Sequence, residues 1–264
     1  MASQPRLLLV GTVHLAPQGE EQLLALLHQV RPACITVEVS RYGLLFRQRQ
    51  APALIARLDA VGAQHAAASE ALAALRQQLL PPFEWRAAQR YCAEAPEGVL
   101  AVPADLSSIS HELLTELVEA CEPENLEQLV EDDFRLTRSH IEQVLLARKY
   151  LRDAHLFPWH LRPAERDQLA RRGAQLARVI AGHLARVAPR PLVHVGGYVH
   201  LLQAPEEGLQ TLASLLTAQG TPFRSLLLGD RLPPPFAPAE AAEPADEEPA
   251  VPLRPLAEVG DLLD

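Results

Sequence analysis

The amino-acid sequence predicts an α/β fold with a mostly parallel central sheet flanked by helices. Short apolar runs rich in Val, Ile and Leu recur along the chain, as is typical of strands buried on both faces of a sheet. Longer segments with apolar residues at helical spacing separate these runs. Strands that alternate with helices in this way form a parallel sheet covered by helices on both faces.

The first part of the chain predicts a strand–helix–strand unit. We expect a strand over residues 6–14, a helix over 18–30 with leucines on one stripe, and a second strand over 33–39. Pro32 stops the helix, because proline cannot continue the helical hydrogen-bond ladder. Such a unit implies parallel pairing of the two strands and a right-handed crossover.

The middle of the chain is mostly helical in pattern. An alanine-rich helical region covers about 44–80 and ends at Pro81-Pro82. A further helix over 83–95 leads into a third strand at 99–102. Residues 107–187 then carry helical periodicity almost throughout. We expect this last stretch to be a large helical insertion between the two strand-bearing halves.

The C-terminal part completes the predicted sheet and ends in a tail. A strand over 192–196, a helix over 206–218 and a strand over 223–228 make residues 1–232 a single α/β domain. Residues 233–264 are rich in Pro, Ala and Glu, a composition that buries too little apolar area to offset the entropy of ordering. We expect this acidic tail to be disordered or loosely docked.

Charge and composition limit the classes of function. Eight acids and one arginine within residues 238–264 account for −7 of the net charge of −9, which leaves about −2 for the rest of the chain. Without a basic patch, a nucleic-acid partner has no electrostatic support. The sequence contains no Gly-x-Ser-x-Gly elbow, P-loop or dinucleotide fingerprint, so serine hydrolase, kinase and dehydrogenase functions are not expected.

The same features predict a cytoplasmic location. The chain has three cysteines without metal-ligand spacing, which indicates a reducing compartment. The N-terminal apolar stretch is shorter than a signal-peptide core, and no stretch approaches the ~20 apolar residues of a membrane span. We therefore expect a soluble protein with a small-molecule or peptide substrate and no membrane partner.

One short pattern occurs twice and marks a candidate site. Gly11 to His14 and Gly197 to His200 both read Gly-x-x-His, and each follows an apolar strand. The strand over 33–39 delivers a carboxylate, Glu38. Ligands of parallel sheets bind outside the carboxyl ends of the strands, where side chains from neighbouring strands ~4.8 Å apart converge. Two histidines and one glutamate are therefore expected to share one site.

This set of side chains suits a divalent transition metal such as Mn, Co or Zn. His14, His200 and Glu38 would be its ligands, with positions left for water and substrate. A bound metal would lower the pKa of that water; alternatively, Glu38 is the general base rather than a ligand. Asp105, after the third strand, is a possible further ligand. Gly11, like Gly197, lets the backbone approach a ligand closely.

The same segments resemble a known family. The segments LLVGTVH at 8–14 and RPACITVE at 31–38 are similar to the TraB/Tiki family, within the erythromycin-esterase/ChaN-like superfamily, as are ERD at 165–167 and VHVGGYVH at 193–200. The resemblance implies an α/β core with helical insertions and either metal-dependent hydrolysis or ester hydrolysis. By motif position His14, Glu38 and His200 would be functional. Arg41 and Arg166 would support them by orienting an acid or a substrate carboxylate.

Two departures from the family pattern keep other functions open. Gln18 and Gly19 stand where the family often has a serine, and Asp105 is followed by Leu106 rather than arginine. These departures favour a non-catalytic protein that binds a small molecule or haem, as ChaN-like members do. A third possibility is an interaction protein whose acidic tail engages a partner. The first hypothesis is a metal-dependent hydrolase of an amide or ester bond.

Other histidines are further candidates for the site. His194 lies within a strand, where alternation predicts a core or supporting position. His155 and His160, with Trp159, interrupt the helical pattern and form either a lid over the pocket or a plain connector.

Overall fold

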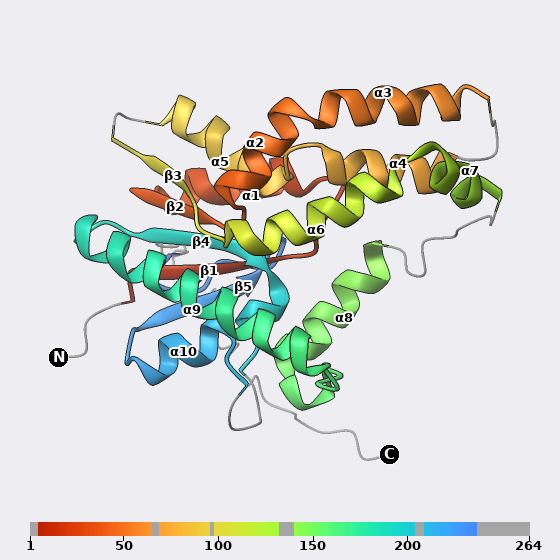
Figure 1. The fold of residues 1–264 in the computed structure, drawn as a ribbon. Coiled ribbons are helices and arrows are strands. Elements are labelled where there is room, and N and C mark those ends of the chain that lie inside the picture. Colours follow the sequence, from red (N-terminus) through yellow and green to blue (C-terminus); the bar gives the residue numbers. More distant parts are fainter. Residues whose placement is uncertain (1–4, 65–68, 96–97, 132–139, 204–208, 237–264) are drawn as a thin grey trace, which may run out of the picture.

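A computed structural model describes residues 5–64, 69–95, 98–131, 140–203 and 209–236. It confirms the α/β fold: a five-stranded parallel sheet in the order β3-β2-β4-β1-β5 is surrounded by helices (Figure 1). Most of the predicted acidic tail, residues 237–264, lies outside the described part of the chain. The strands are β1 (Leu7–Thr12), β2 (Cys34–Val37), β3 (Leu100–Pro103), β4 (Leu192–Gly197) and β5 (Phe223–Leu227).

The strand register brings the two Gly-x-x-His motifs together. β1 and β4 are parallel neighbours, with Gly11 opposite Gly196 and Thr12 opposite Gly197. β4 pairs on its other side with β2, where Val37 lies opposite Val195. The strand that precedes Glu38 therefore lies beside the strand that leads into the second motif. The carboxyl ends of β1, β2 and β4 share one edge of the sheet.

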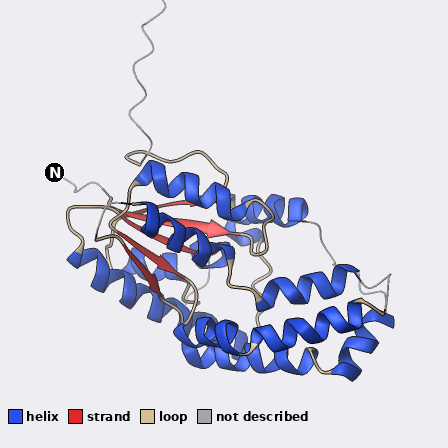
Figure 2. Cartoon of the chain, turned by 90° about the horizontal axis from the view of Figure 1, so that it is seen from above, coloured by secondary structure: helices blue, strands red, loops and turns tan. Residues whose placement is uncertain are grey.

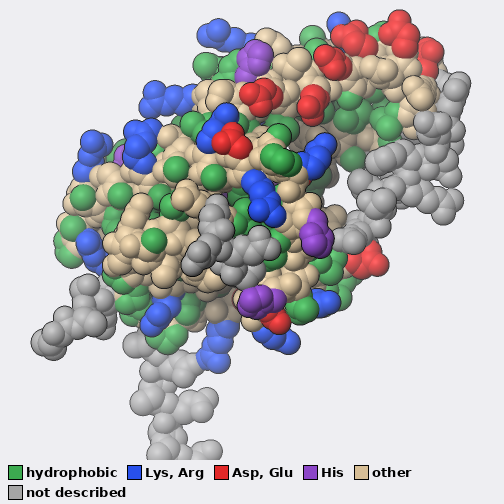
Figure 3. Space-filling view, turned by 60° about the horizontal axis from the view of Figure 1, so that its bottom comes forward, with side chains coloured by type: hydrophobic (Ala, Val, Ile, Leu, Met, Phe, Trp, Pro, Cys, Tyr) green, Lys and Arg blue, Asp and Glu red, His purple; other side chains and the backbone are tan. Residues whose placement is uncertain are grey.

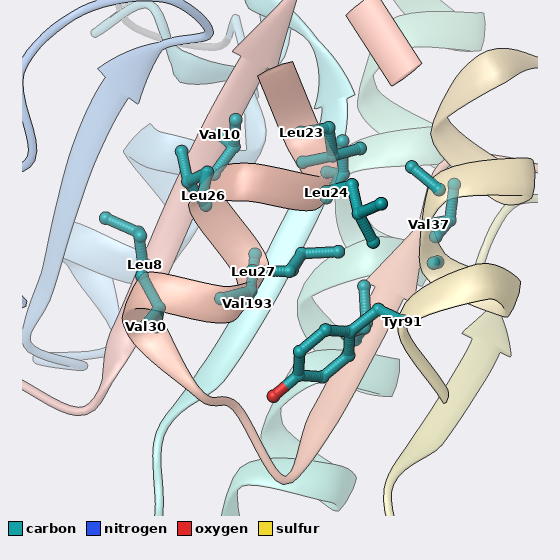
Figure 4. Packing of buried hydrophobic residues seen from close by; sticks show 14 of the residues in the cluster. Leu8, Val10, Leu23, Leu24, Leu26, Leu27, Val30, Val37, Tyr91 and Val193 are labelled. Atoms are coloured by element: carbon teal, nitrogen blue, oxygen red, sulfur yellow. The ribbon is translucent and has the colours of Figure 1, made fainter. Parts of the chain in front are cut away.

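Two layers of helices cover the sheet. Helices α1 (Gly19–Val30) and α5 (Phe83–Glu94) cover one face, and α9 (Pro163–Arg186) and α10 (Leu212–Ala218) cover the other. Alternate residues of β1 point to opposite faces: Leu8 packs under α1, and Leu9 packs under α9 and α10. Each fully buried leucine contributes about 1.5–3 kcal/mol to this core. Figure 4 shows the first layer, with Leu8, Val10, Leu23, Leu24, Leu26, Leu27, Val30, Val37, Tyr91 and Val193.

A helical arm with a core of its own extends from one end of the sheet (Figure 2). It consists of α2 (Arg41–Arg49), α3 (Ala51–Gly62), α4 (Ser69–Leu79), α6 (Ser107–Ala120) and α7 (Pro123–Glu131). The helical region predicted over 44–80 is thus divided into separate helices. Pro52 lies in the first turn of α3, where its missing N–H has no helical partner to lose. The break after α2 therefore lies at Gln50.

The helical stretch 107–187 does not form one unit. Helices α6 and α7 belong to the arm, whereas α8 (His140–Arg152) packs with Val13 and Leu227 near the ends of β1 and β5. After the short 3₁₀ turn η1 (Ala154–Leu156), helix α9 packs on β2 and β4 and covers the sheet. None of the helices in the described part of the chain is long and apolar enough to cross a membrane.

Candidate active site

At the end of β1, the exposed imidazole of His14 is hydrogen-bonded to the buried carboxylate of Glu84. Nδ1 of His14 lies 2.9 Å from Oε1 of Glu84, in the first turn of α5. The hydroxyl of Thr12 donates to the same oxygen at 2.8 Å. The Glu84 side chain is 4% exposed, whereas that of His14 is 59% exposed. Glu84 therefore fixes the orientation of the ring and its tautomer, while more than half of the His14 side chain is exposed.

The second nitrogen of this ring faces the turn after β4. A Cβ atom added to Gly197 would lie 3.0 Å from Nε2 of His14 and 3.7 Å from Oε2 of Glu38. Nε2 makes no hydrogen bond to any residue in the described part of the chain. Burial lowers the pKa of His14, but the hydrogen bond and charge of Glu84 and the charge of Glu38 outweigh it and raise the pKa overall. The ring can thus take up a proton at Nε2 and hold it.

Glu38 is the centre of a buried ionic cluster. Its Oε1 accepts hydrogen bonds from Nε2 of His200 at 3.0 Å and from the guanidinium of Arg172. Its Oε2 accepts the backbone N–H of Gly197 at 2.7 Å. Burial alone would raise the pKa of Glu38, but the charges of His200 and Arg172 hold it well below its usual range. A carboxylate with so low a pKa is a weak base, so Glu38 is poorly suited to take up a proton as the general base.

Arg172 joins two strand ends from the helix that covers them. Its Nε and Nη2 atoms donate to Oδ1 and Oδ2 of Asp105 at 3.1 and 2.8 Å, and Nη2 also reaches Glu38. Asp105 follows β3, and its Oδ1 accepts the N–H of Leu106 at 2.8 Å. This fork-shaped pairing of a guanidinium with a carboxylate is the strong form of the interaction. It ties the ends of β2 and β3 to α9 and is linked to His200 through Glu38.

The structure brings together most of the residues that the sequence singled out. His14, Glu38, His200 and Asp105 all lie at the same edge, joined through Gly197 or Arg172.

Gly11 has a packing role. A Cβ there would lie 3.0 Å from Leu201 and 3.1 Å from the backbone of Tyr198, so the turn after β4 approaches β1 closely.

The two arginines suggested by the family resemblance lie elsewhere. Arg41 begins α2, is exposed, and makes no hydrogen bond or ion pair with a residue in the described ranges. Arg166 donates to the backbone oxygens of Leu161 and Trp159 at 3.3 and 3.4 Å. It lies about 9 Å along α9 from Arg172, which makes the contact with Glu38 instead.

Sequence reasoning missed Glu84 and Arg172. Each is a charged residue within the apolar stripe of its helix: Glu84 lies in register with Ala88 and Tyr91, and Arg172 with Leu176 and Ile180. A charge on the buried stripe of an amphipathic helix needs a partner inside the protein. This interruption of the stripe was the available signal for both residues.

A neutral histidine supports the cluster from within the sheet. His194 on β4 is fully buried, and its Nδ1 lies 3.0 Å from the hydroxyl oxygen of Thr36. Burial lowers the pKa of His194 to about 4. Its Nε2 makes no hydrogen bond with the described residues and would lie 3.2 Å from a Cβ at Gly196. That Cβ would collide with Oε2 of Glu38, so glycine at 196 leaves the room that this carboxylate fills.

The donor set does not fit the predicted metal. Oε1 of Glu38 already accepts from His200 and from the cationic Arg172, whose charge repels a divalent ion. Nδ1 of His14 is committed to Glu84, which leaves Nε2 as the one accessible nitrogen of the predicted ligands. No group of three His, Cys, Asp or Glu side chains within the described ranges is arranged to hold a metal ion.

Haem fits no better at this position. An axial imidazole needs an apolar slot for the macrocycle around its free nitrogen. The free nitrogen of His14 instead faces Gly197 and the Glu38 carboxylate.

The remaining candidates lie away from the cluster. Trp159 is buried against Leu202 and Leu209, and the ring of Phe157 packs against it at a centroid distance of 4.7 Å and an angle of 60°. His155 and His160 are exposed on either side of this aromatic group. The segment is thus anchored by its aromatic side chains to the turn after β4.

Comparisons of the chain with protein-family models, with characterised proteins and with solved structures give no match. The resemblance to the TraB/Tiki family therefore stays a prediction, and the function is inferred from the geometry of the site.

Proposed function

We propose that this protein is a hydrolase of ester or amide bonds in which His14 is the general base. One observation carries the proposal: His14 has Nδ1 fixed by the buried Glu84 and an unoccupied Nε2 at the exposed edge of the sheet. A histidine oriented by a carboxylate and open at its other nitrogen is the arrangement that acid–base catalysis uses. General acid–base catalysis contributes a factor of about 10²–10⁴ to a rate.

The reaction needs one water molecule and one substrate carbonyl. Nε2 of His14 removes a proton from the water while the water oxygen bonds to the carbonyl carbon, which gives a tetrahedral intermediate. The imidazolium then gives the proton to the leaving oxygen or nitrogen as its bond to carbon breaks. Glu84 stabilises the imidazolium between these steps through the hydrogen bond at Nδ1. The products are a carboxylic acid and an alcohol or amine.

The Glu38 cluster serves this base without exchanging protons. The negative charge of Glu38 raises the pKa of His14 and so favours the imidazolium. Its bonds to Gly197 and His200 hold the turn that faces Nε2. Arg172 and Asp105 fix Glu38 in turn, so the surroundings of the base are rigid before substrate arrives. In this proposal Arg172 supplies the positive charge that a metal would otherwise bring to Glu38.

The test compares two histidine–glutamate pairs of the same chain. Purified protein is assayed on a panel of 4-nitrophenyl esters and chromogenic peptides, before and after treatment with a chelator. We expect hydrolysis that survives the chelator and falls about 10²-fold or more in His14→Ala. The control is His28→Ala, because His28 pairs with Glu94 at 3.0 Å on the surface. Folded protein that hydrolyses nothing on the panel, or an active His14→Ala variant, would contradict the proposal.

A further inference from the structure

An apolar groove lies next to the loop that carries His14. It has a volume of about 420 Å³ and runs between the loop after β1, the start of α1, helix α8 and the end of β5. Apolar side chains of its lining include Val13, Ala16, Ile141, Val144, Leu145 and Leu227. Figure 3 shows one face of the molecule, on which basic and histidine side chains stand among hydrophobic ones.

The loop forms a wall shared by the groove and the proposed active site. Val13 and Ala16 line the groove, and His14 between them carries the open Nε2. Leu15 adopts the left-handed conformation, with φ at 65°, and its side chain is 41% exposed. Left-handed backbone is unfavourable for leucine, and such conformations concentrate at functional sites. Leu15 thus adds an exposed apolar side chain to the loop that carries His14 and borders the groove.

The lining of the groove carries few charges, which suits an apolar chain. The ionisable side chains among the described lining residues are His140 and Arg148, and no carboxylate lines the groove. Arg148 is paired with Asp230 at 2.8 Å, which offsets its charge. On α8, Ile141 and Leu145 are 71% and 57% exposed, so the apolar wall continues to the mouth of the groove. Single exposed leucines are ordinary, but this pair adjoins a cavity.

We propose that the groove binds the apolar acyl chain of the substrate, so the preferred substrates are esters or amides of medium-chain carboxylic acids. The inference rests on the proposed hydrolase function. The scissile carbonyl lies over Nε2 of His14, and the chain crosses Leu15 into the groove. Each methylene group that enters it should raise kcat/KM about fourfold, because burying one CH₂ removes apolar surface from water.

The kinetic test compares acetate, butanoate and octanoate esters of 4-nitrophenol. We expect kcat/KM to rise at least tenfold from acetate to octanoate. Leu145→Glu places a charge in the groove, so the ratio of kcat/KM for the octanoate to kcat/KM for the acetate should fall at least tenfold. Leu113→Glu is the matched control, because Leu113 is 49% exposed on α6, outside the groove lining, and should change neither substrate. Equal kcat/KM for all three esters would overturn the inference.

A binding measurement separates this inference from the hydrolase proposal. Octanoic acid is titrated into the wild-type chain and the two leucine variants by calorimetry. We expect binding by wild type and Leu113→Glu, and a loss of at least tenfold in Leu145→Glu. If no ester is hydrolysed but this pattern appears, the groove is supported and the hydrolase proposal fails. If octanoic acid does not bind, or binds Leu145→Glu as well as wild type, the groove is not an acyl site.

Discussion

Nδ1 of His14 and Oε1 of Glu84 lie 2.9 Å apart, which joins the end of β1 to the first turn of α5. The surface pair of His28 and Glu94 has nearly the same separation, 3.0 Å, but both of its side chains are about half exposed. Water screens an exposed pair, so its contribution is small. The buried carboxylate of Glu84 acts on an imidazole whose other nitrogen is available, and this asymmetry separates a candidate base from an ordinary surface contact.

The first prediction concerns the pH dependence of Glu84→Gln. The pKa of His14 is raised by Glu84, and a general base works only when deprotonated, so activity should be lost as pH falls through this raised value. Removing the carboxylate lowers the pKa of His14. The acid limb of kcat/KM should therefore move to lower pH, while kcat falls by about 10²-fold at alkaline pH because the imidazolium loses its partner. Initial rates from pH 5 to 9 measure both effects.

Glu94→Gln is the matched control for this variant. It removes the carboxylate that pairs with His28. The Glu94 side chain is 42% exposed, so this variant should leave the pH profile of kcat/KM unchanged. An acid limb that stays in place in Glu84→Gln would show that His14 does not titrate in the reaction.

The second prediction concerns stability and Glu38→Gln. The pKa of Glu38 is held well below its usual range, so its charge stabilises the folded state fully above the ordinary glutamate pKa of about 4.3. That stabilisation is lost only as pH falls through the lower folded value. Removing one member of a buried ionic cluster leaves its partners unpaired, and the free energy of unfolding should drop by about 3 kcal/mol at pH 7. In urea unfolding, the difference in the free energy of unfolding between wild type and Glu38→Gln should become smaller below about pH 4.3.

Glu21 offers a comparison on the surface. Its side chain is 71% exposed and pairs with Arg90 at 2.7 Å. Glu21→Gln should leave the urea midpoint essentially unchanged, both at pH 7 and below about pH 4.3. A Glu38→Gln variant as stable as wild type at pH 7 would mean that Arg172 and His200 find other partners.

The third prediction uses two glycines of the same chain. Gly196→Ala would push a Cβ onto Oε2 of Glu38 and to 3.2 Å from Nε2 of His194, so it should displace the carboxylate and reduce hydrolysis strongly. Gly182 lies in α9 with nothing within 4 Å of its added Cβ. Gly182→Ala should instead stabilise the protein by about 1 kcal/mol through helix propensity and leave activity unchanged. Thermal unfolding and ester assays on both variants give the comparison.

The sequence was a good guide to the sheet because buried parallel strands carry a local signal. The strand runs before Gly11, Glu38 and Gly197 are short, apolar and bounded by turn residues, and the structure places them side by side. The helices of residues 107–187 were harder to assign. Periodicity predicts that a segment is helical, but it does not say whether its apolar face meets the sheet or the arm. Helix α9 packs on the sheet, whereas α6 packs with α2.

The site was predictable where it depends on strand ends and unpredictable where helices complete it. His14, Glu38 and His200 end consecutive neighbours in the sheet, and a shared edge follows from parallel topology. Glu84 and Arg172 reach that edge from opposite helical layers, and no spacing rule relates a helix position to a strand end. The predicted metal depended on ligand types alone, whereas the choice between a metal and an internal cation depends on the position of Arg172.

The fourth prediction concerns acid sensitivity and His194→Gln. Burial lowers the pKa of His194 to about 4, so the folded state excludes a proton that the unfolded chain takes up at about pH 6.5. Stability is therefore lost as pH falls from about 6.5 towards 4, by up to about 3 kcal/mol from this residue. His194→Gln lacks this loss, and its stability should depend less on pH across that window. Urea titrations at pH 7, 6, 5 and 4.5 test it.

His111 provides the control, since its ring is exposed and packs against Tyr42 at a centroid distance of 5.1 Å. His111→Gln should follow the wild-type pH dependence. Parallel pH profiles for wild type and His194→Gln would contradict a buried neutral histidine at 194.

The last prediction is that removing Arg172 creates the metal site that the donor types suggested. Nη2 of Arg172 contacts Oε1 of Glu38 and lies 2.8 Å from Oδ2 of Asp105, so both oxygens lie around the position of this cation. In Arg172→Ala two carboxylates and His200 would share a site without a positive charge, a donor set that suits Co²⁺. We expect this variant to bind Co²⁺ stoichiometrically, to show visible absorption bands, and to melt at a higher temperature with Co²⁺ than without it. Wild type and Arg172→Lys should show neither. Tight Co²⁺ binding by the wild type that is lost in Glu38→Gln would instead support metal-dependent hydrolysis.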